Sequence, residues 1–143
     1  MDPIDGRAGR RSGSQDLRRT LEYVQDDLRA LVSPRPIIAD GWGLRPELVA
    51  PLMSSTQRMV VTVPTEEFRR YQLRELTRAS ALPLNVSDPQ LAQRNRIARD
   101  RLIAEDAVRN AKRLNIPSIE VDGSRDAQTM ASLVAEHFRE FLP

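Results

Sequence analysis

Apolar residues recur at helical spacing over residues 15–32. They are separated by four, three, four and three positions, which places them on one face of a helix. The residues of this face are Leu17, Leu21, Val24, Leu28 and Leu31. Ser14 suits the N-cap, and Pro34 and Pro36 end the helix because a proline disfavours helical conformation in the residue before it. The pattern therefore predicts a helix over residues 15–32.

Three short segments have the character of β-strands. Residues 37–39 are an apolar run, and residues 59–63 are rich in β-branched side chains without polar alternation. Continuous apolar runs of this length are typical of parallel strands that are buried on both faces. Residues 118–121 form a third candidate strand, which begins directly after Pro117.

Helical segments separate these strands. Capping residues, prolines and apolar periodicity predict helices over residues 45–53, 66–79, 89–114 and 125–142. Alternation of helices with apolar strands is typical of an α/β fold with a parallel sheet and helical crossovers, so we expect one three-layer domain over residues 15–143 with about three strands and five helices. Residues 1–14 contain three glycines, three arginines and few apolar side chains, and we expect a disordered lead-in there.

The composition fits a globular protein and excludes several classes. Of the 143 residues, 40% are hydrophobic, 29% are charged and none is cysteine, so disulfides and cysteine-based zinc sites are impossible. No apolar run approaches the length of a membrane span, and residues 1–15 lack the apolar centre of a signal peptide. A net charge of +2 with 4% aromatic residues disfavours nucleic-acid binding. We therefore expect a cytoplasmic protein that binds neither membranes nor nucleic acids.

The segment around Asp40 carries the best candidates for a site. Asp40 ends the predicted strand 37–39, and ligands of open α/β sheets bind at the carboxyl ends of strands. A carboxylate there suits a bound metal or the proton of a substrate hydroxyl, and it equally suits the cap of the following turn. Trp42, the single tryptophan, would form the wall of a substrate pocket or cover the edge of the core. Arg45 would clamp an anion or remain solvated.

The predicted long helix carries a cluster of arginines, namely Arg94, Arg96, Arg99 and Arg101. Helical geometry brings Arg94 near Arg101 and Arg96 near Arg99, so the four do not share one narrow face. Such a helix fits an element that closes over phosphate groups with one or two arginines directed inward. The alternative is a charged, solvated helix in which Asp100 and Glu105 offset the arginines.

Several segments, in this order, resemble the part of small P-loop kinases that follows the phosphate-binding loop. They are the apolar strand that ends in Asp40 and Gly41, Val-Val-Thr-Val-Pro-Thr-Glu-Glu-Phe-Arg-Arg at 60–70, the arginine-bearing helix at 94–101, and Leu-Asn-Ile-Pro-Ser-Ile-Glu-Val-Asp-Gly at 114–123. The resemblance covers residues 36–142. It implies a P-loop NTPase-like fold and, for an intact family member, transfer of a phosphoryl group from ATP, held with Mg²⁺, to a small-molecule hydroxyl.

The resemblance also implies roles for the candidate residues. Asp40 would act near the acceptor hydroxyl or the metal, and Arg45 would help to bind the acceptor. Asp122 and Gly123 would lie beside the nucleotide base. The residues that would stabilise charge on the transferred phosphoryl group are Arg94, Arg99 and Arg101.

The chain departs from this family at its start. It contains no G-x-x-x-x-G-K-[ST] segment, and its single lysine, Lys112, lies within the predicted long helix. Without loop amides that hold a triphosphate, we expect this chain to bind neither ATP nor Mg²⁺ tightly and to be inactive alone. The family's first strand would lie between strands 37–40 and 59–63, so its loss leaves open sheet edges that pair, dimerise or aggregate. Either the true start lies upstream of Met1 or the protein is a degenerate relative.

A different class of function also fits the sequence. The chain would then be a non-catalytic α/β module that binds an anionic ligand or a partner protein through its arginine-rich helix. Neither interpretation gives the chain a resident metal site, since the single histidine, His137, has no second histidine or cysteine with which to hold a metal.

Overall fold

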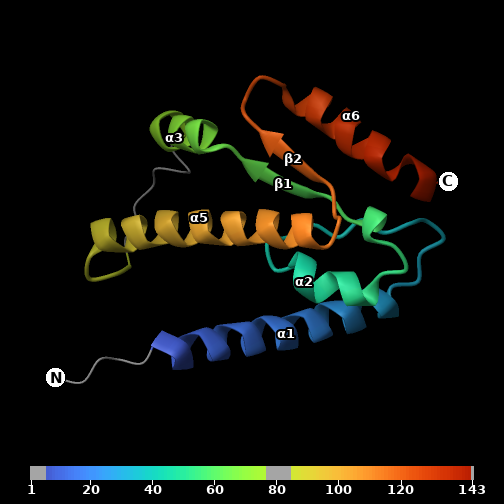
Figure 1. The fold of residues 1–143 in the computed structure, drawn as a ribbon, viewed down its shortest axis with the longest axis horizontal. Helices are drawn as coiled ribbons and strands as arrows, with labels where there is room; N and C mark the ends of the chain where they lie inside the picture. Colours follow the sequence, from blue (N-terminus) through green and yellow to red (C-terminus); the bar gives the residue numbers. More distant parts are fainter. Residues whose placement is uncertain (1–5, 77–84, 143) are drawn as a thin grey trace.

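The chain forms a mixed helical and β structure (Figure 1). This computed structural model describes residues 6–76 and 85–142, with side chains from residue 18 onward. The helices are α1 (Gly6–Ala30), α2 (Pro46–Val49), α3 (Glu66–Glu75), α5 (Pro89–Arg113) and α6 (Ala127–Phe138), and the strands are β1 (Val61–Pro64) and β2 (Ser118–Val121). Short 3₁₀ helices lie at Ala50–Leu52, Thr56–Arg58 and Arg139–Phe141.

The sheet consists of β1 and β2, which run parallel with Val61 opposite Ser118 and Pro64 opposite Val121. The connection between them contains α3 and α5, because parallel strands cannot be joined by a tight turn. α5 packs against both strands, and α6 runs back beside them toward their starting ends (Figure 1). The described part of the chain therefore contains a two-stranded parallel sheet where three strands were expected.

The strand predicted at residues 37–39 does not form. These residues have no regular secondary structure, and Ile37 and Ile38 are 47% and 64% exposed. Pro36 lacks a backbone donor, and an extended segment gains ladder hydrogen bonds only where a neighbouring strand pairs with it. The prediction was wrong because an apolar run indicates a segment that favours pairing, whereas a strand also needs a partner at its edge.

Helices are present in all five predicted ranges with shifted ends, although within residues 45–53 only Pro46–Val49 is α-helical and Ala50–Leu52 is a 3₁₀ helix. α1 begins at Gly6 and so includes residues that we assigned to a disordered lead-in, while residues 1–5 lie outside the described residues. α3 ends at Glu75, and the last three residues of its predicted range, 77–79, also lie outside them. Side-chain caps fix three starts, because the Oγ1 of Thr65 and the carboxylates of Asp88 and Asp126 accept hydrogen bonds from backbone amides of the first turn.

The core lies where β1, β2 and the end of α5 meet. Ala111 and Ile116 are 0% and 4% exposed, and Val61 of β1 is 8% exposed. Asn115 ends α5 with a φ of 53°, a conformation that asparagine tolerates better than most residues. This turn lets the amide of Ile116 donate to the carbonyl oxygen of Ala111 at 2.9 Å and directs the chain into β2.

Candidate functional site

A cavity of about 1010 Å³ opens beside β1. Residues 58–64 line it without a gap in the numbering, and residues 37–42 do the same on another wall. α1, α2, α5 and α6 supply the remaining walls, so segments from both ends of the chain meet here. We call this space the edge cavity.

The edge cavity brings together four of the candidate residues from the sequence. Asp40, Trp42, Arg45 and Arg99 all line it, although Arg99 lies 54 positions or more from the other three in the sequence. Trp42 is 72% exposed and Asp40 is also exposed, so both lie at the rim. Val61, on the strand wall, is buried and marks the floor.

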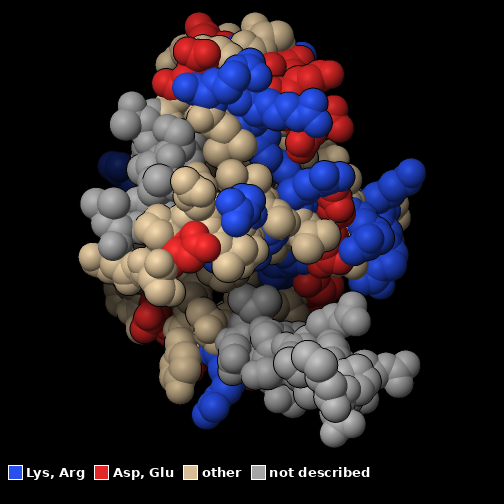
Figure 2. Space-filling view, turned by 90° about the vertical axis from the view of Figure 1, so that its left-hand side faces the viewer, with Lys and Arg blue, Asp and Glu red and all other residues tan. Residues whose placement is uncertain are grey.

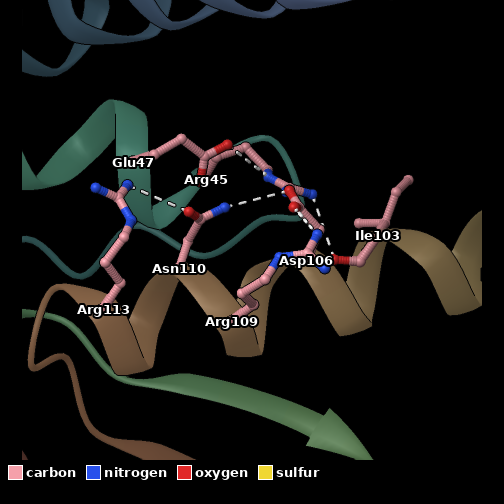
Figure 3. A network of polar contacts seen from close by, with 7 residues as sticks. All are labelled: Arg45, Glu47, Ile103, Asp106, Arg109, Asn110 and Arg113. Carbon is pink, nitrogen blue, oxygen red and sulfur yellow. Dashed lines mark hydrogen bonds and ion pairs between the residues drawn. The ribbon is translucent and has the colours of Figure 1, made fainter.

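Arg45 is buried in a polar network between the start of α2 and α5 (Figure 3). Its Nε donates to Glu47 Oε1 at 3.3 Å, its Nη1 donates to the carbonyl oxygen of Ile103 at 3.4 Å, and its Nη2 donates to Asp106. Asp106 also accepts from Asn110 Nδ2 at 3.3 Å. These contacts tie the segment that follows Trp42 to α5, which is a different role from the acceptor binding that the resemblance implied for Arg45.

Sequence reasoning missed Asp106, which anchors this network. It lies on α5 between Ile103 and Asn110, at offsets of three and four, and so on the inward face of the helix. A carboxylate in an inward stripe needs a cation, because an unpaired buried charge is costly. That position was the signal for an internal ion pair, but the sequence did not identify which arginine supplies it.

The arginines of α5 are dispersed. Arg99 pairs with Asp100 at 2.7 Å and lines the edge cavity, whereas Arg94 and Arg101 do not line it. The hydrogen bond to Glu105, at 2.8 Å, raises the pKa of Arg101 above its ordinary value. On the face shown in Figure 2, basic and acidic side chains are interspersed. The structure therefore places Arg99, alone of these three, at the same cavity as Asp40.

Asp122 and Gly123 form a tight turn at the carboxyl end of β2. The Asp122 carboxylate accepts from the Ser124 hydroxyl at 2.6 Å and from the Ser124 amide at 2.9 Å, and these bonds hold its pKa below the ordinary value. Gly123 has a φ of 84°, and a Cβ on it would lie 2.6 Å from the ring of Phe68. Phe68 therefore lies against this glycine, which the resemblance placed beside a nucleotide base.

Among the described residues, no group of three or more histidine, aspartate and glutamate side chains is arranged to hold a metal ion. Asp40 and Asp100 are the two carboxylates that line the edge cavity, and Asp100 pairs with Arg99.

None of the described helices is long and apolar enough to cross a membrane. A scan against protein-family models and searches of curated proteins and of solved structures found no match to this chain.

Proposed function

We propose that this chain is the acceptor-binding part of a kinase-like phosphotransferase and is inactive on its own. The observation that supports the proposal is the meeting of Asp40, Trp42 and Arg99 at one cavity, since they come from segments far apart in the sequence. Concave, mostly apolar spaces with a few convergent polar groups are the usual sites for small molecules. The cavity volume of about 1010 Å³ is large enough for such a ligand.

Each of these residues has a chemical role in this proposal. The Asp40 carboxylate accepts the proton of the acceptor hydroxyl as the hydroxyl oxygen attacks phosphorus. The Arg99 guanidinium, oriented by Asp100, offsets negative charge on the transferred phosphoryl group. Trp42 provides a broad exposed face against which the apolar part of the acceptor packs.

Acceptor binding is tested by screening small hydroxyl compounds, such as sugars, nucleosides and hydroxy acids, through the quenching of Trp42 fluorescence. For a compound that binds, we expect Asp40→Asn and Arg99→Gln each to weaken the affinity about tenfold or more, as the loss of a charged hydrogen bond does. Arg94→Gln and Arg101→Gln are matched controls on the same helix that do not line the cavity. Equal losses in all four variants would contradict the proposed site.

The inactivity of the chain alone is tested by calorimetry with ATP and Mg²⁺. The sequence lacks the glycine-rich lysine loop whose amides hold triphosphates, so we expect no binding at micromolar concentrations. A micromolar dissociation constant for ATP would show that another part of this chain holds the triphosphate, and the assignment of an acceptor-binding part alone would be wrong.

A further inference from the structure

The two edges of β1 differ in their hydrogen bonding. The amides of Val61 and Thr65 donate to the carbonyl oxygens of Pro117 and Val121, each at 2.9 Å. Successive residues of a strand direct their backbone groups to alternate edges, so the N–H and C=O of Thr62 point away from β2. In the described ranges, 6–76 and 85–142, no strand pairs with this second edge.

The edge cavity lies beside this second edge of β1. A cavity above one face of a strand contacts alternate residues, because successive side chains point to opposite faces. The edge cavity contacts every residue from 58 to 64, and on its other wall every residue from 37 to 42. The space is therefore bounded by the main chain of residues 58–64 on one wall and of residues 37–42 on another. An additional strand would lie between two such extended segments.

The side chains around this space suit an uncharged, apolar occupant. Ile103 and Ala107 line it from α5, and Val134 and Phe138 line it from α6, a helix that lies on the other side of the strands in Figure 1. A strand placed between these helices would be covered on both faces, which requires apolar side chains on both.

Two of the charged side chains in the walls of the edge cavity have partners within the protein, because Arg45 pairs with Glu47 and Asp106 and Arg99 pairs with Asp100. The two others that lack an ion pair among the described residues, Asp40 and Arg58, have opposite signs. The walls therefore carry no excess of one sign, and an uncharged segment suits them.

We propose that the edge cavity accepts an extended apolar segment of a partner polypeptide, which pairs with β1 through the backbone of Thr62. Strand addition of this kind takes its affinity from main-chain hydrogen bonds and its specificity from the pockets for alternate side chains. β1 has four residues, and at about 3.3 Å per residue a segment of about four to six residues covers it. The proposal rests on the open edge of β1 and not on the phosphotransferase assignment, although Asp40, Trp42 and Arg99 line the same cavity.

The test measures amide exchange of the full chain with a peptide library. Each peptide has five central positions drawn from valine, isoleucine, leucine and threonine, between pairs of lysines that keep it soluble. We expect bound peptide to slow exchange of the Thr62 amide by about tenfold or more, with little change at Val61, which already donates to β2. Lysine-flanked glycine–serine peptides serve as the control.

Variants of the strand edge and of the far wall make the test specific. Thr62→Pro removes the outward N–H without removing a bond to β2, and we expect it to lower peptide affinity about tenfold or more, whereas Thr62→Val keeps the N–H and the affinity. Val134→Asp charges the α6 wall and should have a similar effect if Thr62→Pro fails to fold. Far-ultraviolet circular dichroism checks the fold of each variant.

Three results would overturn the proposal. The first is that no peptide of the library slows exchange at Thr62. The second is peptide binding that leaves the Thr62 amide unprotected, which would indicate a general apolar surface or a small-molecule site. The third is protection of Thr62 that rises with protein concentration in the absence of peptide, which would make a second copy of this chain the occupant. Acceptor binding at Asp40 and Arg99 is tested separately, by the quenching of Trp42 fluorescence.

Discussion

Two regions with apolar residues, on the two sides of β1, differ in how far their side chains are exposed to solvent. On the β2 side, Val61, Ala111 and Ile116 are buried and 8% exposed or less. On the other side, Ile38 and Trp42 are 64% and 72% exposed. The buried residues lie where β1 pairs with β2 and α5 packs against both strands, whereas no strand pairs with residues 37–42 among the described residues.

The largest effect should come from removing core side chains on the packed side. Ile116→Ala is expected to lower the free energy of unfolding by about 3 kcal/mol, since it removes buried methyl groups and leaves a cavity. Ile38→Ala, the matched change on the open side, should alter it by less than about 0.5 kcal/mol. Urea denaturation measures both, and similar losses would contradict the contrast between the two regions.

A smaller effect is expected from two glycines, one in each region. Gly123→Ala forces a Cβ onto a residue with a φ of 84° and against the ring of Phe68, and we expect a loss of about 2 kcal/mol. Gly41→Ala meets nothing within 4 Å and should change stability by less than about 0.5 kcal/mol.

The double variant Phe68→Ala with Gly123→Ala separates the two causes of that loss. The Phe68→Ala change removes the steric contact and leaves the backbone strain at residue 123. Gly123→Ala should therefore lower the free energy of unfolding by less in the Phe68→Ala background than in the parent chain. An unchanged cost would show that the contact with the ring does not contribute.

The network around Arg45 joins the two regions, so its loss should affect both. Asp106→Ala leaves the buried guanidinium of Arg45 with fewer partners and is expected to cost about 1.5 kcal/mol, below the value for a fully buried pair because the Asp106 side chain is 37% exposed. Arg109→Gln removes an exposed partner of the same carboxylate and should cost less than about 0.5 kcal/mol. Fluorescence of Trp42 should shift in Asp106→Ala and stay unchanged in Arg109→Gln.

The smallest expected effect is on the pH dependence of stability, through Asp122 in the turn after β2. Hydrogen bonds from Ser124 lower the folded-state pKa of Asp122. A carboxyl group with a lowered folded pKa adds stability above its unfolded pKa of about 3.9, and this contribution is lost as the pH falls through the folded pKa. Asp122→Asn should therefore reduce the change in urea midpoint between pH 6 and pH 2.5. The same pH dependence in both proteins would exclude a contribution from this turn.

Most helices and strands of the chain could be predicted from the sequence, but the pairing of strands in the sheet could not. Helix starts at Thr65, Asp88 and Asp126 follow from capping residues, and β1 and β2 follow from short apolar or β-branched runs. These signals depend on neighbouring residues. Whether residues 37–39 become a strand depends on a partner elsewhere, and no local pattern encodes that partner.

For the candidate site, the sequence predicted some of the residues that line the cavity but not their long-range contacts. Asp40 and Arg99 were chosen for their chemistry, and the structure places both at the edge cavity. The burial of Arg45 was not foreseen, because its partner Asp106 lies 61 positions away. The contact between Gly123 and Phe68 was not foreseen either, because the two residues lie 55 positions apart.

The two edges of β1 differ in hydrogen bonding, and amide exchange of the free protein tests this difference residue by residue. We predict slow exchange for the amides of Val61 and Thr65, which donate to Pro117 and Val121, and exchange at least about tenfold faster for Thr62, which faces the edge cavity. If the Thr62 amide exchanges as slowly as its two neighbours in monomeric protein, the second edge is already paired. The open edge and the proposed strand addition would then both be wrong.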